Sequence, residues 1–478
     1  MASPKPSNVD FHVEDREAMT DKVQTSFDGI EDISVDSERE RKLLRKIDLR
    51  LMCSLWVLYL FSYMDRSNIG NAHVAGMDVA LDLTDSEYST AIVVFVVGYI
   101  IGQVPSNMFL TRLRPSLYIP TMMILWGIVV SFMGMIKTPA QLIGLRLLLG
   151  LMEASFVPAV VFLISMWYKK TEQSKRFMFF TSAAILAGAF GGIVAGAITK
   201  TLDGAHGISG WRWLFIVEGA ATVGIGLIAP WCLLDYPATS KALTEEEREL
   251  AVRRLVEDGV VASIDGEGEI SHLKALKAAL SNWRLWLLVA GYHCIISTLS
   301  LSYFYPYIVR SLGYASVQAQ FMTAPIYFTA FAIAVPCCVL ADRYPNKRVV
   351  FVTTAMFLGS IFCILITTVL SDVPRYVFLC FLTACIWTAN PIAESFASSS
   401  MASIQPEVRA ISLAFINSVG NLAQIYGSYL LPSWDAPRHS RGFGTFAGLL
   451  FIGGCVYCAA MILLRRRPFK LARTHASP

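Results

Sequence analysis

The sequence has few charged residues and long stretches with none. Of its 478 residues, 16% are Asp, Glu, Lys or Arg, and the mean hydropathy is +0.52. About a quarter of the residues of an average soluble domain are charged. The deficit excludes an ordinary soluble enzyme or binding domain and is typical of a chain that lies mostly in a membrane.

Several motifs that carry chemistry are also absent from the sequence. It has no G-x-x-x-x-G-K-[ST] loop, no H-E-x-x-H motif and no G-x-S-x-G turn, so ATP-driven transport and hydrolysis have no support. We predict no enzyme activity and no cofactor, with a proton as the coupling ion. The basic tracts flank apolar runs, which indicates a lipid bilayer as partner and no nucleic acid.

Neither a disulfide framework nor a cleavable leader is expected. The ten cysteines lie within or beside apolar runs, where thiols behave as small hydrophobic groups. The pair Cys455 and Cys458 has no second ligand pair, so we assign it no metal. The first forty positions contain many acidic residues and no apolar core of a leader peptide. We therefore predict a disordered, uncleaved tail over residues 1–46.

Twelve apolar runs approach the ~20 residues that a helix needs to cross a bilayer core. They begin near Leu51, Tyr88, Ile119, Leu142, Phe177, Trp213, Leu285, Phe321, Val349, Tyr376, Ile411 and Phe446. Lys and Arg cluster before the first run, after the second, fourth and eighth, and after the twelfth. Since cytoplasmic loops carry this excess, both termini are predicted to be cytoplasmic. The fold class is therefore an all-α membrane protein.

The longest polar insertion divides the chain into two sets of six runs. We predict a bundle of six helices at 47–234, a cytoplasmic linker with a short helix at 235–283, a second bundle at 284–466 and a tail at 467–478. The turns "TRLRPS" and "ADRYPNKR" occupy matching places in the two halves, as expected of an internal repeat.

The second of these turns resembles the Asp-Arg and basic turn of the major facilitator superfamily. Asp342, Arg343 and Lys347 carry the likeness, which implies a gating turn. The first turn lacks the Asp. In this superfamily, six-helix halves rock about a central site, so the resemblance implies the major facilitator fold.

Four further stretches of the sequence indicate one branch of this superfamily. "DRSNIGNA", "GYIIGQVPSN", "RLLLGLMEASFVPA" and "GAFGGIVAGAI" together resemble the fungal allantoate permease family, in the anion:cation symporter branch of the superfamily. The likeness runs through all twelve runs and is densest in the first half. It implies uptake, with protons, of small organic anions such as allantoate, nicotinate or other vitamin and carboxylate compounds.

Four charged residues lie inside two apolar runs at compatible depths. At 1.5 Å per residue, Asp65 and Arg66 lie about 21 Å from the cytoplasmic start of the first run. Arg146 lies at nearly the same depth in the fourth run, and Glu153 is close to the midplane. Charges there are costly unless they are paired or hydrated, so we expect them to line a water-filled cavity.

Two interpretations of these charges stay open. In one, two buried salt bridges, Asp65 with Arg146 and Glu153 with Arg66, only fix helix packing. In the other, the carboxylates bind protons and the guanidinium groups bind the substrate or its empty-site partner, because the Arg fork grips a carboxylate bidentately. The family resemblance implies proton sites at Asp65 and Glu153, and anion contact at Arg66. Arg146 is then the charge partner.

Other polar side chains lie on helical faces of the apolar runs. Tyr63, Tyr99, Asn417 and Asn421 are candidates for substrate contact, although such side chains also form hydrogen bonds between helices. In the tenth run, Asn390 and Glu394 are predicted to lie along the transport pathway.

The resulting hypothesis is a monomeric secondary active transporter that imports a small organic anion with protons by alternating access. We expect a multi-pass protein of the plasma membrane, with a vacuolar or other internal membrane as the alternative. Two other functions stay open: export of an acidic metabolite by the same fold, and a nutrient receptor that binds the anion without transport. Neither the anion nor the direction of transport follows from the sequence.

Overall fold

The structure is a computed structural model that describes residues 37–110, 114–237, 239–257, 272–401 and 406–466. It has two units, Met1–Asp48 and Leu49–Pro478. The described part of the first unit consists chiefly of the helix α2 (Ser37–Ile47). The predicted tails at 1–46 and 467–478 lie largely outside the described residues.

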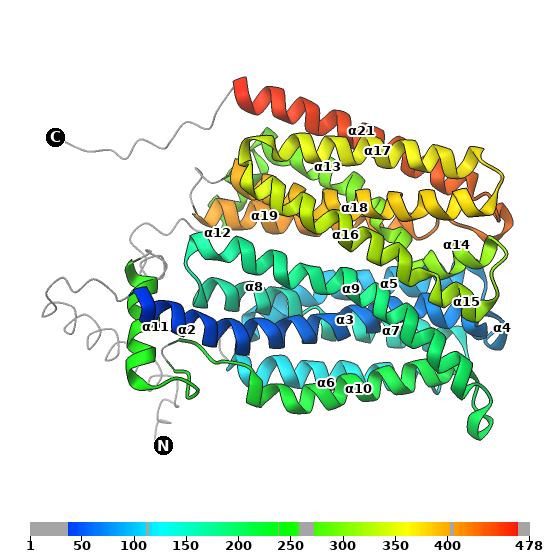
Figure 1. Cartoon of the computed structure of the whole chain (residues 1–478), viewed down its shortest axis with the longest axis horizontal. Coiled ribbons are helices and arrows are strands. Elements are labelled where there is room, and N and C mark those ends of the chain that lie inside the picture. Colours follow the sequence, from blue (N-terminus) through cyan, green and yellow to red (C-terminus); the bar gives the residue numbers. More distant parts are fainter. Residues whose placement is uncertain (1–36, 111–113, 238, 258–271, 402–405, 467–478) are drawn as a thin grey trace, which may run out of the picture. The chain divides into compact units, whose positions relative to one another are not determined.

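All regular elements in the described part of the second unit are helices (Figure 1). The first half (residues 49–234) contains α3 (Cys53–Ala72), η2 (His73–Met77), α4 (Asp78–Ala80), α5 (Asp85–Leu110), α6 (Pro115–Met133), α7 (Pro139–Glu153), α8 (Phe156–Trp167), α9 (Lys170–Leu202) and α10 (Gly210–Cys232). The interruption between α7 and α8 falls directly after Glu153.

The regular elements of the linker and of the second half are also helices. The linker carries α11 (Glu245–Glu257) and α12 (His272–Leu280). The second half (residues 283–466) contains α13 (Trp283–Leu299), η5 (Ser300–Tyr303), α14 (Tyr305–Ser311), α15 (Ser316–Phe321), α16 (Thr323–Arg343), α17 (Arg348–Thr368), α18 (Asp372–Ser400), α19 (Pro406–Asn421), α20 (Ala423–Gly427) and α21 (Ser440–Arg466). The prediction of an all-α fold is confirmed.

Eleven helical segments among the described residues are long and apolar enough to cross a membrane. They correspond to eleven of the twelve predicted runs. The remaining run, which begins near Ile411, forms α19 and α20, which separate at Leu422. The arrangement is thus that of a twelve-helix protein in which the span of α19 and α20, like that of α7 and α8, is interrupted.

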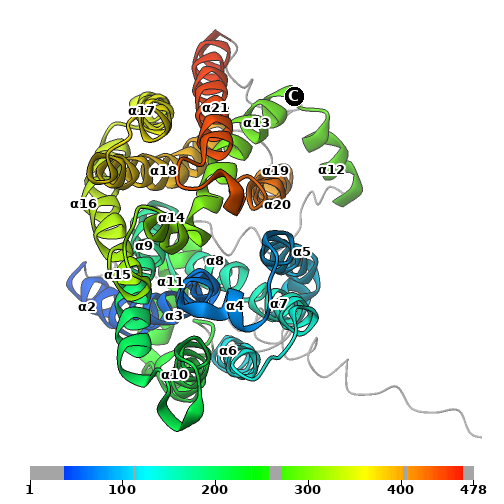
Figure 2. The same cartoon turned by 90° about the vertical axis from the view of Figure 1, so that its right-hand side faces the viewer.

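The helices of each half pack mainly on one another. In the first half α10 lies against α6 and α3, and α5 lies against α7. In the second half α17 lies against α18 and α21, and α13 lies against α19 and α21. Figure 2 shows these two groups, with α6, α7 and α10 in one and α17, α18 and α21 in the other. The predicted domain boundaries stay a prediction.

The two halves meet along α9 and α16 and at one end of the helices. On α9, a Cβ added to Gly192 would lie 1.9 Å from Thr323 Oγ1, so glycine permits this close approach. At the end, the Tyr88 hydroxyl donates to the Tyr303 carbonyl (3.1 Å), and Ser433 Oγ donates to Asp85 Oδ2 (2.6 Å). Contacts of this kind close that end of the interface.

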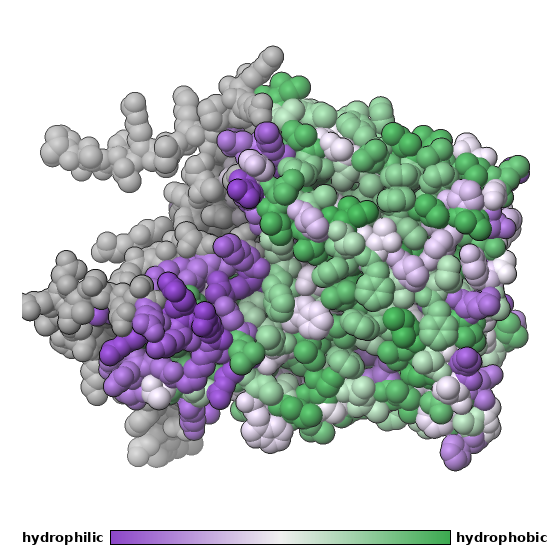
Figure 3. Space-filling model, viewed as in Figure 1, coloured by the Kyte–Doolittle hydropathy of each residue, from purple (hydrophilic) through white to green (hydrophobic). Residues whose placement is uncertain are grey.

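Large apolar side chains cover the outer face of the helices. Figure 3 shows them over α9, α16 and α17. Phe190 is 40% exposed, Val339 51% and Ile361 51%. A continuous apolar surface of this kind would cause aggregation in water but is what lipid tails contact.

Candidate functional site

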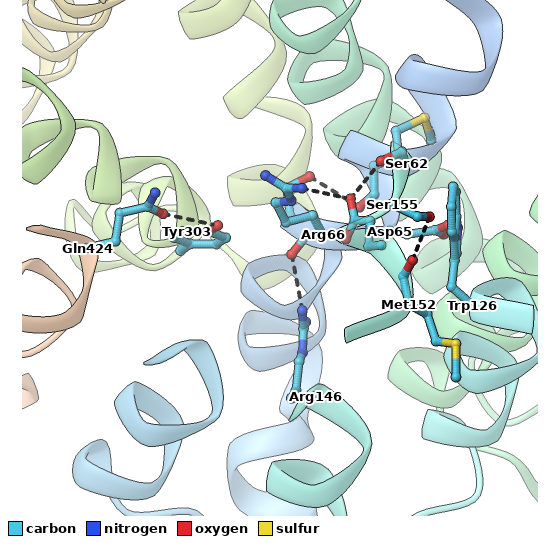
Figure 4. A network of polar contacts seen from close by, with 12 residues as sticks. Ser62, Asp65, Arg66, Trp126, Arg146, Met152, Ser155, Tyr303 and Gln424 are labelled. Atoms are coloured by element: carbon cyan, nitrogen blue, oxygen red, sulfur yellow. Dashed lines mark hydrogen bonds and ion pairs between the residues drawn. The ribbon is translucent and has the colours of Figure 1, made fainter. Parts of the chain in front are cut away.

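The candidate site begins at two adjacent residues of α3 that point in different directions. Asp65 projects toward Trp126 on α6, whereas Arg66 projects to the side where Tyr303 and Gln424 lie (Figure 4). Successive side chains on a helix diverge by about 100°. The pair "DR" therefore serves two environments, one within the first half and one that faces the second half.

Arg66 forms an ion pair with Glu153. Its Nη2 donates to Glu153 Oε1 at 2.9 Å, and Ser62 Oγ donates to the same oxygen at 2.6 Å. The Glu153 side chain is 1% exposed and that of Arg66 is 16% exposed. The guanidinium group is thus the more accessible partner of a pair that links α3 to the end of α7.

Aromatic rings surround the Arg66 guanidinium. Its central carbon lies 4.8 Å from the centroid of the Tyr99 ring, 5.1 Å from Phe95 and 5.9 Å from Tyr63. A cation within about 6 Å of an aromatic face is attracted to it. The three rings therefore hold the guanidinium group in place. Glu153 Oε2 and Arg66 Nε have no hydrogen-bond partner among the described residues.

Asp65 has a different set of partners, which the sequence did not indicate. Trp126 Nε1 donates to its Oδ2 at 3.2 Å, and Thr222 Oγ1 on α10 donates to the same oxygen at 2.8 Å. The side chain is 1% exposed, and Oδ1 has no partner within the part of the chain that the structure describes. Asp65 therefore lies among α3, α6 and α10.

Arg146 lies behind Arg66, on α7. Its Nη1 donates to the Arg66 carbonyl at 3.3 Å (Figure 4). Arg146 is 1% exposed, and its Nε and Nη2 lack hydrogen-bond partners in the described ranges. The four predicted charges are thus brought together, although the pair that forms directly is Arg66 with Glu153. The roles assigned to all four stay predictions.

A chain of hydrogen bonds runs through the polar residues of the second half. The Tyr292 hydroxyl donates to Glu394 Oε1 at 2.6 Å, and Asn417 Nδ2 donates to the same oxygen at 3.3 Å. From there Asn421 donates to Asn417 Oδ1, and Gln424 donates to Asn421 Oδ1, at 2.9 and 2.8 Å.

This chain ends close to the candidate site. The Tyr303 hydroxyl donates to Gln424 Oε1 at 3.4 Å, on the side toward which Arg66 projects (Figure 4). The Tyr63 and Trp387 rings also meet edge to face at 5.9 Å between α3 and α18. Asn390 is partly buried, and its Oδ1 has no hydrogen-bond partner among the described residues.

The predicted gating turn contains an ion pair with a residue outside the predicted set. Asp342 Oδ1 accepts from Arg348 Nη2 at 2.8 Å, and Arg348 also donates to the Ser399 hydroxyl. Arg343 is exposed, and the Lys347 ammonium lies 5.5 Å from the Tyr344 ring centroid. Arg348 thus ties the turn to α18.

One buried carboxyl near the site was missed by the sequence analysis. Glu218 on α10 is 3% exposed and lies one turn before Thr222, whose hydroxyl donates to Asp65. A signal was present, because "FIVEGAA" puts a lone Glu inside an apolar run, and an ionisable residue in a span marks a functional candidate.

Comparison with known proteins gives the family. A model of the Major Facilitator Superfamily matches residues 55–428. The chain is 35% identical over 443 residues to the MFS transporter prlL of a fungal species (strain NRRL 50135), covering 90% of this chain and 87% of that one. It is 30% identical to the pantothenate transporter liz1 of Schizosaccharomyces pombe (89% and 82% covered) and 29% identical to a putative tartrate transporter of Agrobacterium vitis (90% and 96% covered).

Solved structures agree on the fold. A bacterial homologue of the lysosomal transporter Spinster, inward-facing and unoccupied, matches with a TM-score of 0.64 at 15% identity, covering 92% of this chain and all of that one. A D-xylose-proton symporter matches with a TM-score of 0.64 at 16% identity, covering 90% and 99%. With its helices, its sequence relatives and this fold in agreement, the chain belongs to the Major Facilitator Superfamily and is a multi-pass membrane transporter, not an enzyme.

Proposed function

We propose that this transporter imports a small organic anion together with protons, as a member of the fungal allantoate permease family in the anion:cation symporter branch. The single observation that carries the proposal is the Arg66–Glu153 ion pair, 2.9 Å long, in which the Arg66 side chain is partly exposed and the Glu153 side chain is buried. An anion and Glu153 compete for the same cation.

Competition for Arg66 couples the two solutes. When a substrate carboxylate binds the guanidinium fork, Glu153 loses its counter-charge, and a buried carboxyl without a counter-charge retains a proton more readily. Conversely, a proton on Glu153 frees Arg66 for the anion. Each ligand therefore favours binding of the other, as reciprocal linkage requires. Asp65 is the second proton site of the proposal.

The names of two relatives support the substrate class. Pantothenate and tartrate are both carboxylates, and transport of each is named for a relative that aligns with about nine-tenths of this chain. We propose that the substrate carboxylate contacts Arg66, with Tyr63 and Tyr99 beside it. Asn417 and Asn421 contact its polar remainder, and Glu394 and Asn390 lie along the pathway.

The contacts between the halves support alternating access. Hydrogen bonds such as Tyr88 to Tyr303 and Ser433 to Asp85 close one end. We place this end outside and the linker in the cytoplasm, with both termini cytoplasmic, because Lys and Arg cluster at the linker end of the spans. The turn with Asp342, Arg343 and Lys347 then lies at the cytoplasmic end as a gate. We propose the plasma membrane and a monomer.

The test is uptake into proteoliposomes that contain the purified full-length chain. Labelled pantothenate, tartrate, nicotinate and allantoate are added with and without an imposed pH gradient, after a panel of anions has been ranked by thermal stabilisation. Gradient-driven accumulation that a protonophore abolishes supports the proposal. Gradient-driven loss from preloaded vesicles indicates export, and saturable binding without flux indicates a receptor; either outcome refutes proton-coupled import.

A further inference from the structure

Glu218 is a buried carboxyl that the proposed mechanism does not use. It lies on α10, is 3% exposed, and neither carboxyl oxygen has a hydrogen-bond partner among the described residues. A buried carboxylate is unfavourable unless it is paired or accepts hydrogen bonds. A protonated Glu218 avoids this cost because it is neutral.

The position of Glu218 brings it beside Asp65. One turn further along α10, Thr222 Oγ1 donates to Asp65 Oδ2 at 2.8 Å, and α10 packs on α3. Asp65 keeps Oδ1 without a partner within the described ranges. Since the two helices belong to spans of opposite direction, Glu218 lies level with the turn of α3 that follows Asp65 and carries Asn68. The Asn68 side-chain amide is also buried without a hydrogen-bond partner in the described residues.

The charged groups on the surrounding elements do not neutralise Glu218. On α10, Arg212 donates to the Gly134 carbonyl, nearly two turns away. In η2, the His73 ring packs on the Tyr88 ring, with centroids 4.2 Å apart. On α7, Arg146 donates to the Arg66 carbonyl and Glu153 pairs with Arg66. On α6, the Trp126 indole donates to Asp65.

We propose that Asp65 and Glu218 form one proton-binding site, a buried carboxyl pair in which Glu218 holds the proton while Asp65 is ionised. Two adjacent carboxyls in apolar surroundings do not both ionise. During transport, once helix movement brings the two carboxyls to hydrogen-bond distance, the O–H bond of Glu218 breaks, its electron pair stays on the Glu218 carboxylate, and a new O–H bond forms on Asp65 Oδ1. The total charge of the pair does not change in this step. The exchange step rests on the proposed proton-coupled function.

Whether Glu218 carries a proton can be tested without a transport assay. Infrared spectra of the purified full-length protein at pH 7 should contain the C=O stretch of a protonated carboxyl, and Glu218→Gln should lose it. Glu172→Gln is the matched control, because Glu172 forms an ion pair with Arg254 at 2.6 Å. A protonated-carboxyl band that is unchanged in Glu218→Gln overturns the proposal. If that variant does not fold, Glu218→Asp decides: a shifted band supports the proposal and an unshifted one refutes it.

The exchange of the proton is tested in proteoliposomes. Glu218→Gln should lose at least about fivefold of the gradient-driven accumulation, the lower range of coupling between two sites, while anion counterflow and thermal stabilisation by the anion persist. Accumulation by Glu218→Gln equal to that of the wild type would refute proton exchange. Gln resembles a Glu that stays protonated, so such a result would mean that the Glu218 proton does not move during transport. If anion accumulation by the wild-type protein does not depend on the pH gradient, the proposed function is refuted instead. The infrared result does not depend on that outcome.

Discussion

Replacing Glu153 with Gln should make the transporter bind its anion more tightly while it loses coupling to protons. In the wild type the anion must displace Glu153 from Arg66, which breaks the hydrogen bond of 2.9 Å between two charged groups. A hydrogen bond to a charged group contributes about 1.5 to 3 kcal/mol. Since 1.4 kcal/mol is tenfold in a dissociation constant, the variant should bind about 10- to 150-fold more tightly.

The assay is anion binding to purified protein at several pH values, followed by uptake in proteoliposomes. Binding to Glu153→Gln should not depend on pH through this residue, whereas wild-type binding should strengthen toward acid pH. Gradient-driven accumulation by the variant should be lost. Binding that is unchanged or weaker in Glu153→Gln would refute the competition for Arg66.

A matched control separates this effect from the general loss of a buried ion pair. Glu172 pairs with Arg254 on the linker helix at 2.6 Å, with side chains 19% and 1% exposed. Its replacement by Gln removes an ion pair of the same type away from the candidate site. Glu172→Gln should leave the anion affinity and its pH dependence at wild-type values.

Three further predictions concern other parts of the chain. Arg66→Lys should weaken anion binding by about tenfold or more, because Lys lacks the planar fork and the stacking of a guanidinium; titration of the anion checks it, and wild-type affinity would exclude bidentate recognition. Gly150→Ala should lower the thermal unfolding temperature, because the added Cβ would lie 2.2 Å from the Phe95 carbonyl oxygen, whereas Gly144→Ala on the same helix meets nothing within 4 Å and should not; equal melting of the two variants would contradict this. Burial lowers the pKa of His439 to about 4 from 6.5, so the unfolded state binds that proton first and stability should fall as the pH drops from 6.5 toward 4. His439→Asn, which tolerates the left-handed φ of 47°, should remove up to about 3 kcal/mol of this pH dependence in denaturation profiles, and an unaltered profile would refute the assignment.

The fold followed from the sequence because the bilayer imposes a length on every span. A run such as the one after Val349 has enough apolar residues to cross the membrane, and in the structure α17 (Arg348–Thr368) occupies it. The same reasoning identified Asp65, Arg66, Arg146 and Glu153, since charges inside such runs are few and costly. The break at Leu422 was not predicted.

Only the tertiary structure decided which of these charges meet and what else surrounds them. The spans are apolar on nearly all sides, so their sequence contains little of the 3.6-residue pattern that would tell which face points at which neighbour. For that reason the sequence could not show that Asp65 turns toward Trp126 and Thr222, that Arg348 pairs with Asp342, or that Glu218 lies beside Asp65. The sequence by itself determined which stretches form long apolar helices and which charges lie inside them, because hydrophobic length is a local property. The partners of each charge depend on helix rotation and packing, which residues far apart in the chain settle together.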